Sequence, residues 1–200
     1  MREPKWKSYA VLMPEPILTP LQCEEFIQIG TGQPKLDGNI MQRGKSTGEP
    51  DPKGRKSSIS WIPFEAAREN YGIIVECMET ANANFFGFDD IRPFESGQYA
   101  EYSKGDFYDW HSDIGVDQVP MPLVRKISMS ILLNDPKEFE GGQLELFSRG
   151  FDGGIEGINV QKLKQGQAIF FASFHVHRVR PVIEGTRKAL VMWFGGKPFK

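Results

Sequence analysis

The feature that most constrains the fold is a succession of short β-type segments that fills the chain after about residue 95. These segments are rich in β-branched and aromatic residues, and glycine or proline separates most of them; they are Ser96–Tyr102, Phe107–His111, Lys126–Leu133, Gln143–Phe147, Ala168–Ala172, Val176–Val182 and Lys188–Phe194. Many short strands with turn signals between them are typical of a sandwich or barrel, and not of alternating βα units. The second half of the chain therefore predicts a β-sandwich or jelly roll.

The first half of the chain carries helical patterns instead. Thr19 and Gln22 have the spacing of a capping box, so a short helix is expected to begin here and to end near Gly30. A longer helix is expected over about Phe64–Ala83, because apolar residues fall on one face at helical spacing. The segment Thr31–Ser58 between them is rich in Gly, Pro, Lys and Ser, which predicts a long loop that is either a mobile lid or disordered.

Length and composition indicate one soluble domain. The chain has 200 residues, 40% of them hydrophobic and 25% charged, and no linker divides it, so residues 1–200 are expected to form one α+β domain. The formal net charge of −2 gives no general attraction to nucleic acid. No apolar run is long enough for a signal peptide or a membrane span, so we expect a cytoplasmic protein away from membranes. The oligomeric state stays open.

The sequence has three histidines, and one of them forms a pair with a nearby aspartate. His111 and Asp113 are two positions apart in an expected strand, so both side chains point to one face with Cα atoms roughly 6–7 Å apart, close enough for one metal ion. His177 is the candidate for a third ligand. Two imidazoles and one carboxylate leave three coordination positions open, which is the arrangement of non-haem Fe(II) oxygenases. Two open positions suit a bidentate 2-oxo acid, and one suits O₂.

Two alternatives stay open at this point. His175 and His177 alternate on an expected strand, so both face the same side and one of them can be an ordinary hydrogen-bonding histidine. The same ligand types also bind zinc. Because the spacing of His111 and Asp113 arises by chance in many proteins, the metal hypothesis depends on the rest of the sequence.

Further motifs surround the histidine–aspartate pair in a fixed order. In full, the pattern reads Tyr102…Gly105…Tyr108-x-x-His111-x-Asp113, Arg125-x-x-Ser128-x-x-Ile131-x-Leu133-Asn134, Gly141-Gly142-x-Leu144-x-Leu146, Gly166-x-Ala168-Ile169-Phe170-Phe171, His177-Arg178-Val179-x-Pro181-Val182-x-x-Gly185-Thr186-Arg187 and Trp193. Over about residues 95–196 this pattern resembles the catalytic domain of prolyl 4-hydroxylase-type 2-oxoglutarate/Fe(II) dioxygenases. No single motif is specific, but the ordered set is.

The resemblance implies a double-stranded β-helix, which is a jelly-roll variant, as a catalytic core over about residues 95–196. Residues 1–94 would then supply N-terminal helices that support the core by packing on one sheet. By the same resemblance, His111, Asp113 and His177 bind Fe(II), 2-oxoglutarate is the cosubstrate and O₂ is the oxidant. The resemblance also adds ascorbate to the candidate cofactors.

The resemblance also implies a binding site for the cosubstrate. Arg187 lies ten positions after His177 and would anchor the far carboxylate of 2-oxoglutarate, which a guanidinium fork can bind in a bidentate manner. Tyr102 and Tyr108 match positions of the family pattern whose tyrosines hydrogen-bond the cosubstrate or shape its pocket. The alternative for both is packing in an aromatic core. Some prolyl hydroxylases carry tyrosine where this chain has Leu132, so one contact to the cosubstrate is expected to be absent or to come from elsewhere.

The resemblance favours a prolyl residue of a peptide or protein as the substrate. Tyr99, Trp193 and Arg125 are the candidates for its pocket, and core packing is the alternative for Trp193. Two other functions stay open: hydroxylation of a free amino acid or other small molecule, and a non-catalytic jelly-roll binding module. The complete His–Asp–His set together with Arg187 argues against the binding module, and nucleic acid is not expected as a partner.

Overall fold

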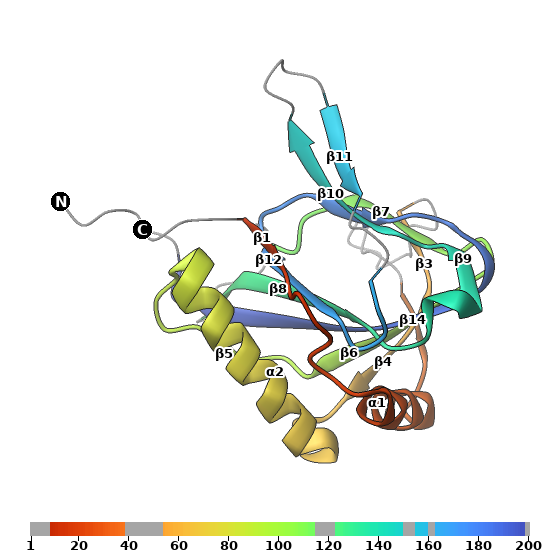
Figure 1. The fold of residues 1–200 in the computed structure, drawn as a ribbon, viewed down its shortest axis with the longest axis horizontal. Helices are drawn as coiled ribbons and strands as arrows, with labels where there is room; N and C mark the ends of the chain where they lie inside the picture. The colour runs from red at the N-terminus through yellow and green to blue at the C-terminus, as the bar shows by residue number, and fades with distance from the viewer. Residues whose placement is uncertain (1–8, 39–53, 115–122, 150–154, 160–162, 199–200) are drawn as a thin grey trace, which may run out of the picture.

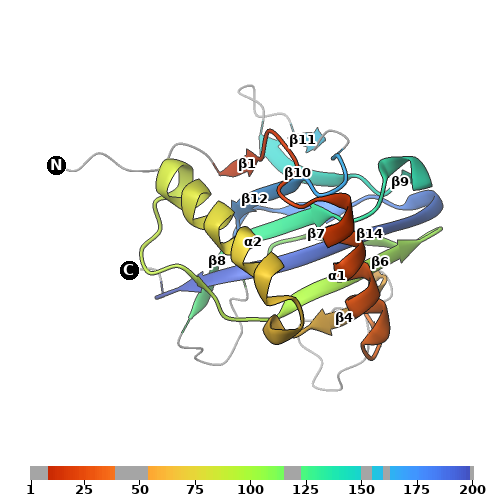
Figure 2. The same cartoon turned by 60° about the horizontal axis from the view of Figure 1, so that its bottom comes forward.

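Two β-sheets and a layer of helices form the described part of the chain. This computed structural model describes residues 9–38, 54–114, 123–149, 155–159 and 163–198. Figure 1 shows three layers, with the helices α1 (Pro20–Gly32) and α2 (Arg68–Ala81) on one side of the larger sheet and the smaller sheet on its other side. Figure 2 shows both helices lying across the same face of the larger sheet.

The larger sheet has nine strands within the described ranges. Its order is β1-β12-β8-β14-β6-β4-β2, and β5 and β9 pair with opposite ends of β14. All of these pairings are antiparallel. The strands are β1 Ala10–Leu12, β2 Leu36–Asp37, β4 Ser58–Ile62, β5 Arg92–Pro93, β6 Gly97–Ser103, β8 Val124–Leu132, β9 Phe139–Gly141, β12 Ala168–Ala172 and β14 Val182–Gly196.

The smaller sheet has five strands among the residues described, in the order β11-β10-β13-β7-β3, and its pairings are also antiparallel. Two antiparallel sheets packed face to face make a jelly-roll core, so the predicted α+β fold is confirmed. The strands of the smaller sheet are β3 Arg55–Lys56, β7 Phe107–His111, β10 Leu144–Arg149, β11 Ile155–Asn159 and β13 His177–Val179.

Helix α1 begins where the capping box predicts it. Thr19 Oγ1 accepts from the Gln22 backbone N–H at 3.3 Å, and Gln22 Oε1 accepts from the Thr19 N–H at 2.8 Å.

The prediction of a single helix over Phe64–Ala83 is wrong in one respect, because Ala67, with φ of −142°, separates a 3-10 turn from α2. None of the described helices has the length and apolar character needed to span a bilayer. The short helical turns are η1 Phe64–Ala67, η2 Asn82–Phe86 and η3 Pro136–Glu138.

The helices cover a large apolar core on one face of the larger sheet. Phe26 of α1 and Tyr71, Ile74 and Met78 of α2 are all buried in one cluster with side chains of β8, β12 and β14. The rings of Phe26 and Tyr71 meet edge to face, with centroids 5.4 Å apart. The prediction that N-terminal helices pack on one sheet is confirmed, and a second apolar cluster fills the space between the two sheets.

The first half of the chain contains more strands than its sequence predicts. The single loop expected over Thr31–Ser58 is wrong, because α1 continues through Gly32 and β2, β3 and the first residue of β4 fall within that range. Two-residue strands carry no periodicity of their own, and their pairing with β4 and β7 decides their conformation. The expected lid lies mainly in residues 39–53, outside the described residues. The first 94 residues also do more than supply supporting helices, because their strands β1 and β4 extend the larger sheet.

Candidate metal and cosubstrate site

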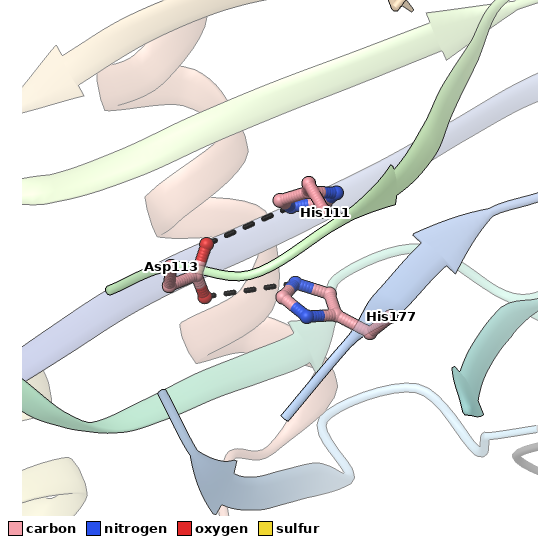
Figure 3. A group of neighbouring side chains, drawn as sticks. All are labelled: His111, Asp113 and His177. Atoms are coloured by element: carbon pink, nitrogen blue, oxygen red, sulfur yellow. Dashed lines mark ion pairs between the residues drawn. The ribbon is translucent and has the colours of Figure 1, made fainter. Parts of the chain in front are cut away.

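His111, Asp113 and His177 come together at the ends of two neighbouring strands (Figure 3). His111 is the last residue of β7 and His177 is the first residue of β13, and the antiparallel register places them directly opposite each other. Asp113 follows β7 by two positions, where its backbone N–H donates to the Ser173 carbonyl at 2.9 Å. One potential ligand atom of each residue lies within 4.8 Å of the other two. The three expected ligands are therefore close enough to bind one ion.

Backbone carbonyls orient the two imidazoles. His111 Nδ1 lies 2.8 Å from the Asp109 carbonyl oxygen, and His177 Nδ1 lies 2.9 Å from the His175 carbonyl oxygen. Because a carbonyl only accepts, these contacts place a proton on Nδ1 of each ring, so Nε2 is the nitrogen that can face a metal. Each Nε2 lies 3.6 Å from a different oxygen of Asp113. Backbone support of the non-ligating nitrogen is usual for metal-binding histidines.

The protonation states at the site also suit a divalent cation. Burial, followed by the neighbouring His177, lowers the pKa of His111 to about 3, so this ring is neutral near pH 7. Burial acts to raise the pKa of Asp113, but His177, His111 and a 2.6 Å hydrogen bond from Ser128 Oγ outweigh it and hold this pKa below its ordinary value. Neutral imidazole and ionised carboxylate are the forms that bind a metal.

His175 lies outside this cluster. Its Nε2 is 2.8 Å from the Phe147 carbonyl oxygen, while its own carbonyl holds the ring of His177. His175 therefore has the hydrogen-bonding role that the sequence left open for one of the two histidines.

Arg187 lies on β14 and points into the cavity that the three residues line. It is 3% exposed, and among the described residues its guanidinium has no carboxylate partner and no hydrogen-bond acceptor. Burial lowers its pKa, because removal from water disfavours the charged form. A buried cation without a partner is costly, so this arginine fits an anionic ligand that enters the cavity.

Tyr102 and Tyr108 both line the same cavity, as the resemblance implies. Tyr102 is the cross-strand neighbour of Arg187, whose Cζ lies 5.8 Å from the centre of its ring. The ring of Tyr108 stacks on that of His111 at 3.4 Å between centroids, and burial raises the pKa of Tyr108 to about 12. Both tyrosines are therefore positioned to shape the cavity, and Tyr108 stays a neutral phenol.

The three residues expected in a substrate pocket have different positions. Trp193 lines the cavity, and its buried Nε1 has no hydrogen-bond partner in the described structure. Arg125 stacks on this indole, with Cζ 3.9 Å from the ring centre, and forms a two-point ion pair with Glu95. Arg125 is not among the side chains that line the cavity. Trp193 nevertheless lies close enough to Asp113 to help lower the pKa of that carboxyl, although no hydrogen bond joins them in the described structure.

Tyr99 requires a correction, because the structure places it on the opposite face of the larger sheet. Its side chain is buried in the core beneath the helices and donates to Glu101 Oε1 at 3.0 Å. A Cβ on Gly30 of α1 would lie 2.5 Å from the Tyr99 ring, which shows how closely helix and tyrosine pack. Tyr99 is three positions from Tyr102 on one strand, so the two side chains point to opposite faces.

Sequence reasoning missed two polar residues that line the cavity. Arg55 of β3 and Gln98 of β6 are both buried there and are hydrogen-bonded to each other at 3.0 Å. Arg55 lies in the segment predicted as a loop, and only its pairing with Tyr108 on β7 brings it to the site. The local sequence around Arg55 carries no signal of this contact.

These parts define a class of protein. A jelly roll that holds two imidazoles, one carboxylate and a buried arginine with no partner among the described residues around one cavity has the arrangement of a mononuclear non-haem Fe(II) oxygenase that uses a 2-oxo acid.

Comparison with known sequences leads to the particular family. The profile of the 2OG-Fe(II) oxygenase superfamily matches residues 97–195. The chain belongs to this superfamily and is a 2-oxoglutarate-dependent dioxygenase, a class that uses Fe(II), 2-oxoglutarate and O₂, and its relatives described below are PKHD-type hydroxylases. The predicted family, enzyme class and cofactors are thereby confirmed.

Two relatives illustrate how much of the chain the similarity covers. A PKHD-type hydroxylase of Colwellia psychrerythraea is 25% identical over 177 residues, which are 88% of this chain and 74% of that protein. A PKHD-type hydroxylase of Xylella fastidiosa strain M23 is 32% identical over 103 residues, which are 48% of this chain and 42% of that protein. The second match therefore spans less than half of the relative's length.

Solved structures of low identity support the same fold. A viral collagen prolyl hydroxylase from Paramecium Bursaria Chlorella virus-1 has a TM-score of 0.66 at 22% identity, covering 95% of this chain and 97% of that one. A prolyl hydroxylase from Trichoplax adhaerens, in complex with a peptide fragment of hypoxia inducible factor, has a TM-score of 0.68 at 18% identity, covering 94% and 84%. At these identities the likeness establishes the fold alone.

Proposed function

We propose that this chain hydroxylates a prolyl residue of a peptide or protein at a metal centre held by His111, Asp113 and His177. The observation that supports this assignment most directly is the buried, unpaired Arg187 in the same cavity as the three ligands. A purely structural zinc site would not require a buried cation at this position. The names of the relatives and the peptide complex of one structural neighbour support a peptide substrate.

Each residue then has a defined part in the reaction. When bound, Fe(II) with 2-oxoglutarate and O₂ supplies the oxidation that inserts oxygen into a C–H bond. His111, Asp113 and His177 would hold the ion, and three protein ligands would leave coordination positions for the cosubstrate and O₂. Arg187 binds the far carboxylate of the cosubstrate, and Tyr102 packs beside that guanidinium.

The cavity walls limit access of water. Phe171 and Leu144 between the sheets and Tyr108 beside His111 surround the three ligands with apolar surface. A dry site strengthens the electrostatic attraction between Arg187 and its carboxylate. Trp193 Nε1 provides one further donor for a ligand or for Asp113. These side chains position the reactants, while the metal centre carries the chemistry.

The test measures cosubstrate binding and turnover separately. Anaerobic protein with Fe(II) and 2-oxoglutarate should form the weak visible band of the chelate, and His111→Ala should not. Protein loaded with Zn(II), which is d¹⁰ and redox-inactive, is the control without a band. Aerobic reactions with proline-rich peptides and ascorbate should give succinate and peptides heavier by one oxygen. A folded, metal-loaded wild-type protein without the band would refute the assignment, whereas a band without peptide oxidation would refute the prolyl substrate.

A further inference from the structure

Three buried or half-buried arginines lie in or near the cavity, and only one of them has a carboxylate partner among the described residues. Arg125 is neutralised by its two-point pair with Glu95. Arg187 has the position for the far carboxylate of the cosubstrate. Arg55, which is 7% exposed, has no carboxylate within ion-pair distance in the described residues.

All the contacts of Arg55 are with neutral groups. Its Nε donates to Ser57 Oγ at 2.8 Å, and its Nη2 donates to Gln98 Oε1 at 3.0 Å. Its Cζ lies 4.5 Å from the ring centre of Tyr108. Nη1 has no acceptor among the residues that the structure describes, and the same holds for Gln98 Nε2. Each of the two hydrogen-bonded side chains therefore has one donor nitrogen without a partner in the described structure.

Arg55 is also close to the reacting centre. It lines the same cavity as the three metal ligands. Its partner across the strands is Tyr108, whose ring also stacks on His111 at 3.4 Å between centroids. A group bound by Arg55 would therefore lie one aromatic ring away from a metal ligand, on the side of β3 and β6.

The charge balance of the loaded site leaves Arg55 uncompensated. The charges of Fe(II), ionised Asp113, Arg187 and the 2-oxoglutarate dianion cancel one another. Arg55 then remains as a buried positive charge whose neighbours are a serine, an amide and a phenol. Buried charges in proteins are normally paired, and a guanidinium fork matches a carboxylate best.

We propose that Arg55 and Gln98 form a subsite for a carboxylate of the substrate, so that the hydroxylated peptide carries an Asp or Glu side chain close to the target residue. This inference rests on the proposed peptide hydroxylase function and adds the chemical class of its substrate. Arg55 Nη1 and Gln98 Nε2 donate to the carboxylate. Binding of the acidic peptide neutralises the charge that Fe(II) and the cosubstrate leave on Arg55.

The test compares matched peptides with the complete, loaded enzyme. A library of end-blocked peptides, each with one proline, holds pairs that differ only by Glu against Gln, or Asp against Asn, at each position near the proline. Hydroxylation is measured by mass spectrometry, and binding is measured by equilibrium dialysis against anaerobic protein loaded with Mn(II) and 2-oxoglutarate. The acidic member of at least one pair should be preferred about tenfold or more, which is the effect of one charge-assisted hydrogen bond.

Three variants separate charge recognition from a structural role of Arg55. Arg55→Met should abolish the acidic preference, and Gln98→Glu should abolish it while keeping Arg55, because an internal carboxylate then pairs with the guanidinium. Lys56→Met is the matched control, since this neighbouring cation is on the surface, paired with Asp106, and should leave the preference unchanged. Each variant is first checked for the Fe(II)–2-oxoglutarate band. A residue that binds only the substrate is not needed for this band, so the band should persist in Arg55→Met.

The outcomes distinguish this inference from the proposed function. Equal hydroxylation of acidic and neutral peptides would overturn the carboxylate subsite and leave the hydroxylase intact. If no peptide is hydroxylated, the prolyl function fails, and the dialysis result still decides the subsite. Acidic preference that survives in Gln98→Glu would also overturn the role of Arg55.

Discussion

The two faces of the larger sheet use the same strands for different purposes. On β14, Leu190, Met192 and Phe194 point towards the helices and belong to the apolar core, whereas Arg187 and Trp193 point into the cavity between the sheets. The helix face is closed and satisfied by its own side chains. The inner face keeps a buried cation and a buried indole N–H without partners in the described structure.

The difference follows from the period of two along a strand, which separates neighbouring residues onto opposite faces. One strand can therefore contribute to a stabilising core and to a binding site at the same time. Changes on the helix face should alter the free energy of unfolding without altering ligand affinity. Changes on the inner face should do the reverse.

The largest effect is expected at the metal site. His177→Ala removes one of three ligands, so Fe(II) binding should be lost and succinate formation should fall by about a thousandfold or more, equivalent to about 4 kcal/mol. Metal content after dialysis and single-turnover assays measure this. His175→Ala, which changes a residue bonded to a backbone carbonyl, is the control and should keep activity within about twofold. Equal loss in both variants would contradict the assignment of His177.

The next effect concerns the helix face. Phe26→Ala should lower the free energy of unfolding by about 3–5 kcal/mol, because this fully buried ring contacts both helices and sheet. Urea unfolding measures the change, and the folded protein should bind 2-oxoglutarate with unchanged affinity. Leu21→Ala on the same helix, where the side chain is 84% exposed, should change stability by less than about 0.5 kcal/mol. Weaker cosubstrate binding in folded Phe26→Ala would show that the two faces are coupled.

A smaller effect is expected for the cosubstrate anchor. Arg187→Met should weaken 2-oxoglutarate binding by about 30- to 100-fold, the loss of one charge-assisted contact of about 2–3 kcal/mol, while Fe(II) affinity stays the same. Stability should not fall, since an apolar side chain replaces a buried unpaired charge. Titration of the chelate band measures the affinity. Arg180→Met, at a half-exposed residue paired with Glu145, should leave the affinity unchanged.

The smallest effect is a pH dependence of the metal-free protein. The folded pKa of His111 is about 3 and its ordinary value is 6.5, so between these values the unfolded chain binds a proton that the folded protein does not. Stability should therefore fall as the pH drops below about 6.5, by at most about 1.4 kcal/mol per pH unit from this residue. Urea unfolding at pH 7 and pH 5.5 measures the slope. His111→Asn should make it shallower, and an unchanged slope would contradict the buried neutral imidazole.

Much of the fold follows from local pattern. The strands β7 and β12 have the bounds that the sequence predicts, because short runs rich in aromatic and apolar residues between turn signals mark them clearly. The strands β2 and β3 were not predictable, since two residues carry no periodicity and only their partners define them. Tyr99 was assigned to the wrong face because β6 is buried on both sides, and a strand with two buried faces does not reveal which one lines a cavity.

The sequence by itself determined the capping box of α1, the jelly-roll class and the residues from which a metal site can be built. Tertiary structure alone decided that His111 lies opposite His177, that Arg125 is neutralised by Glu95, and that Arg187 and Arg55 have no carboxylate partner among the described residues. The physical reason is that capping and alternation depend on neighbours along the chain. Charge compensation depends on contacts between distant segments, and only the folded packing of the two sheets brings those segments together.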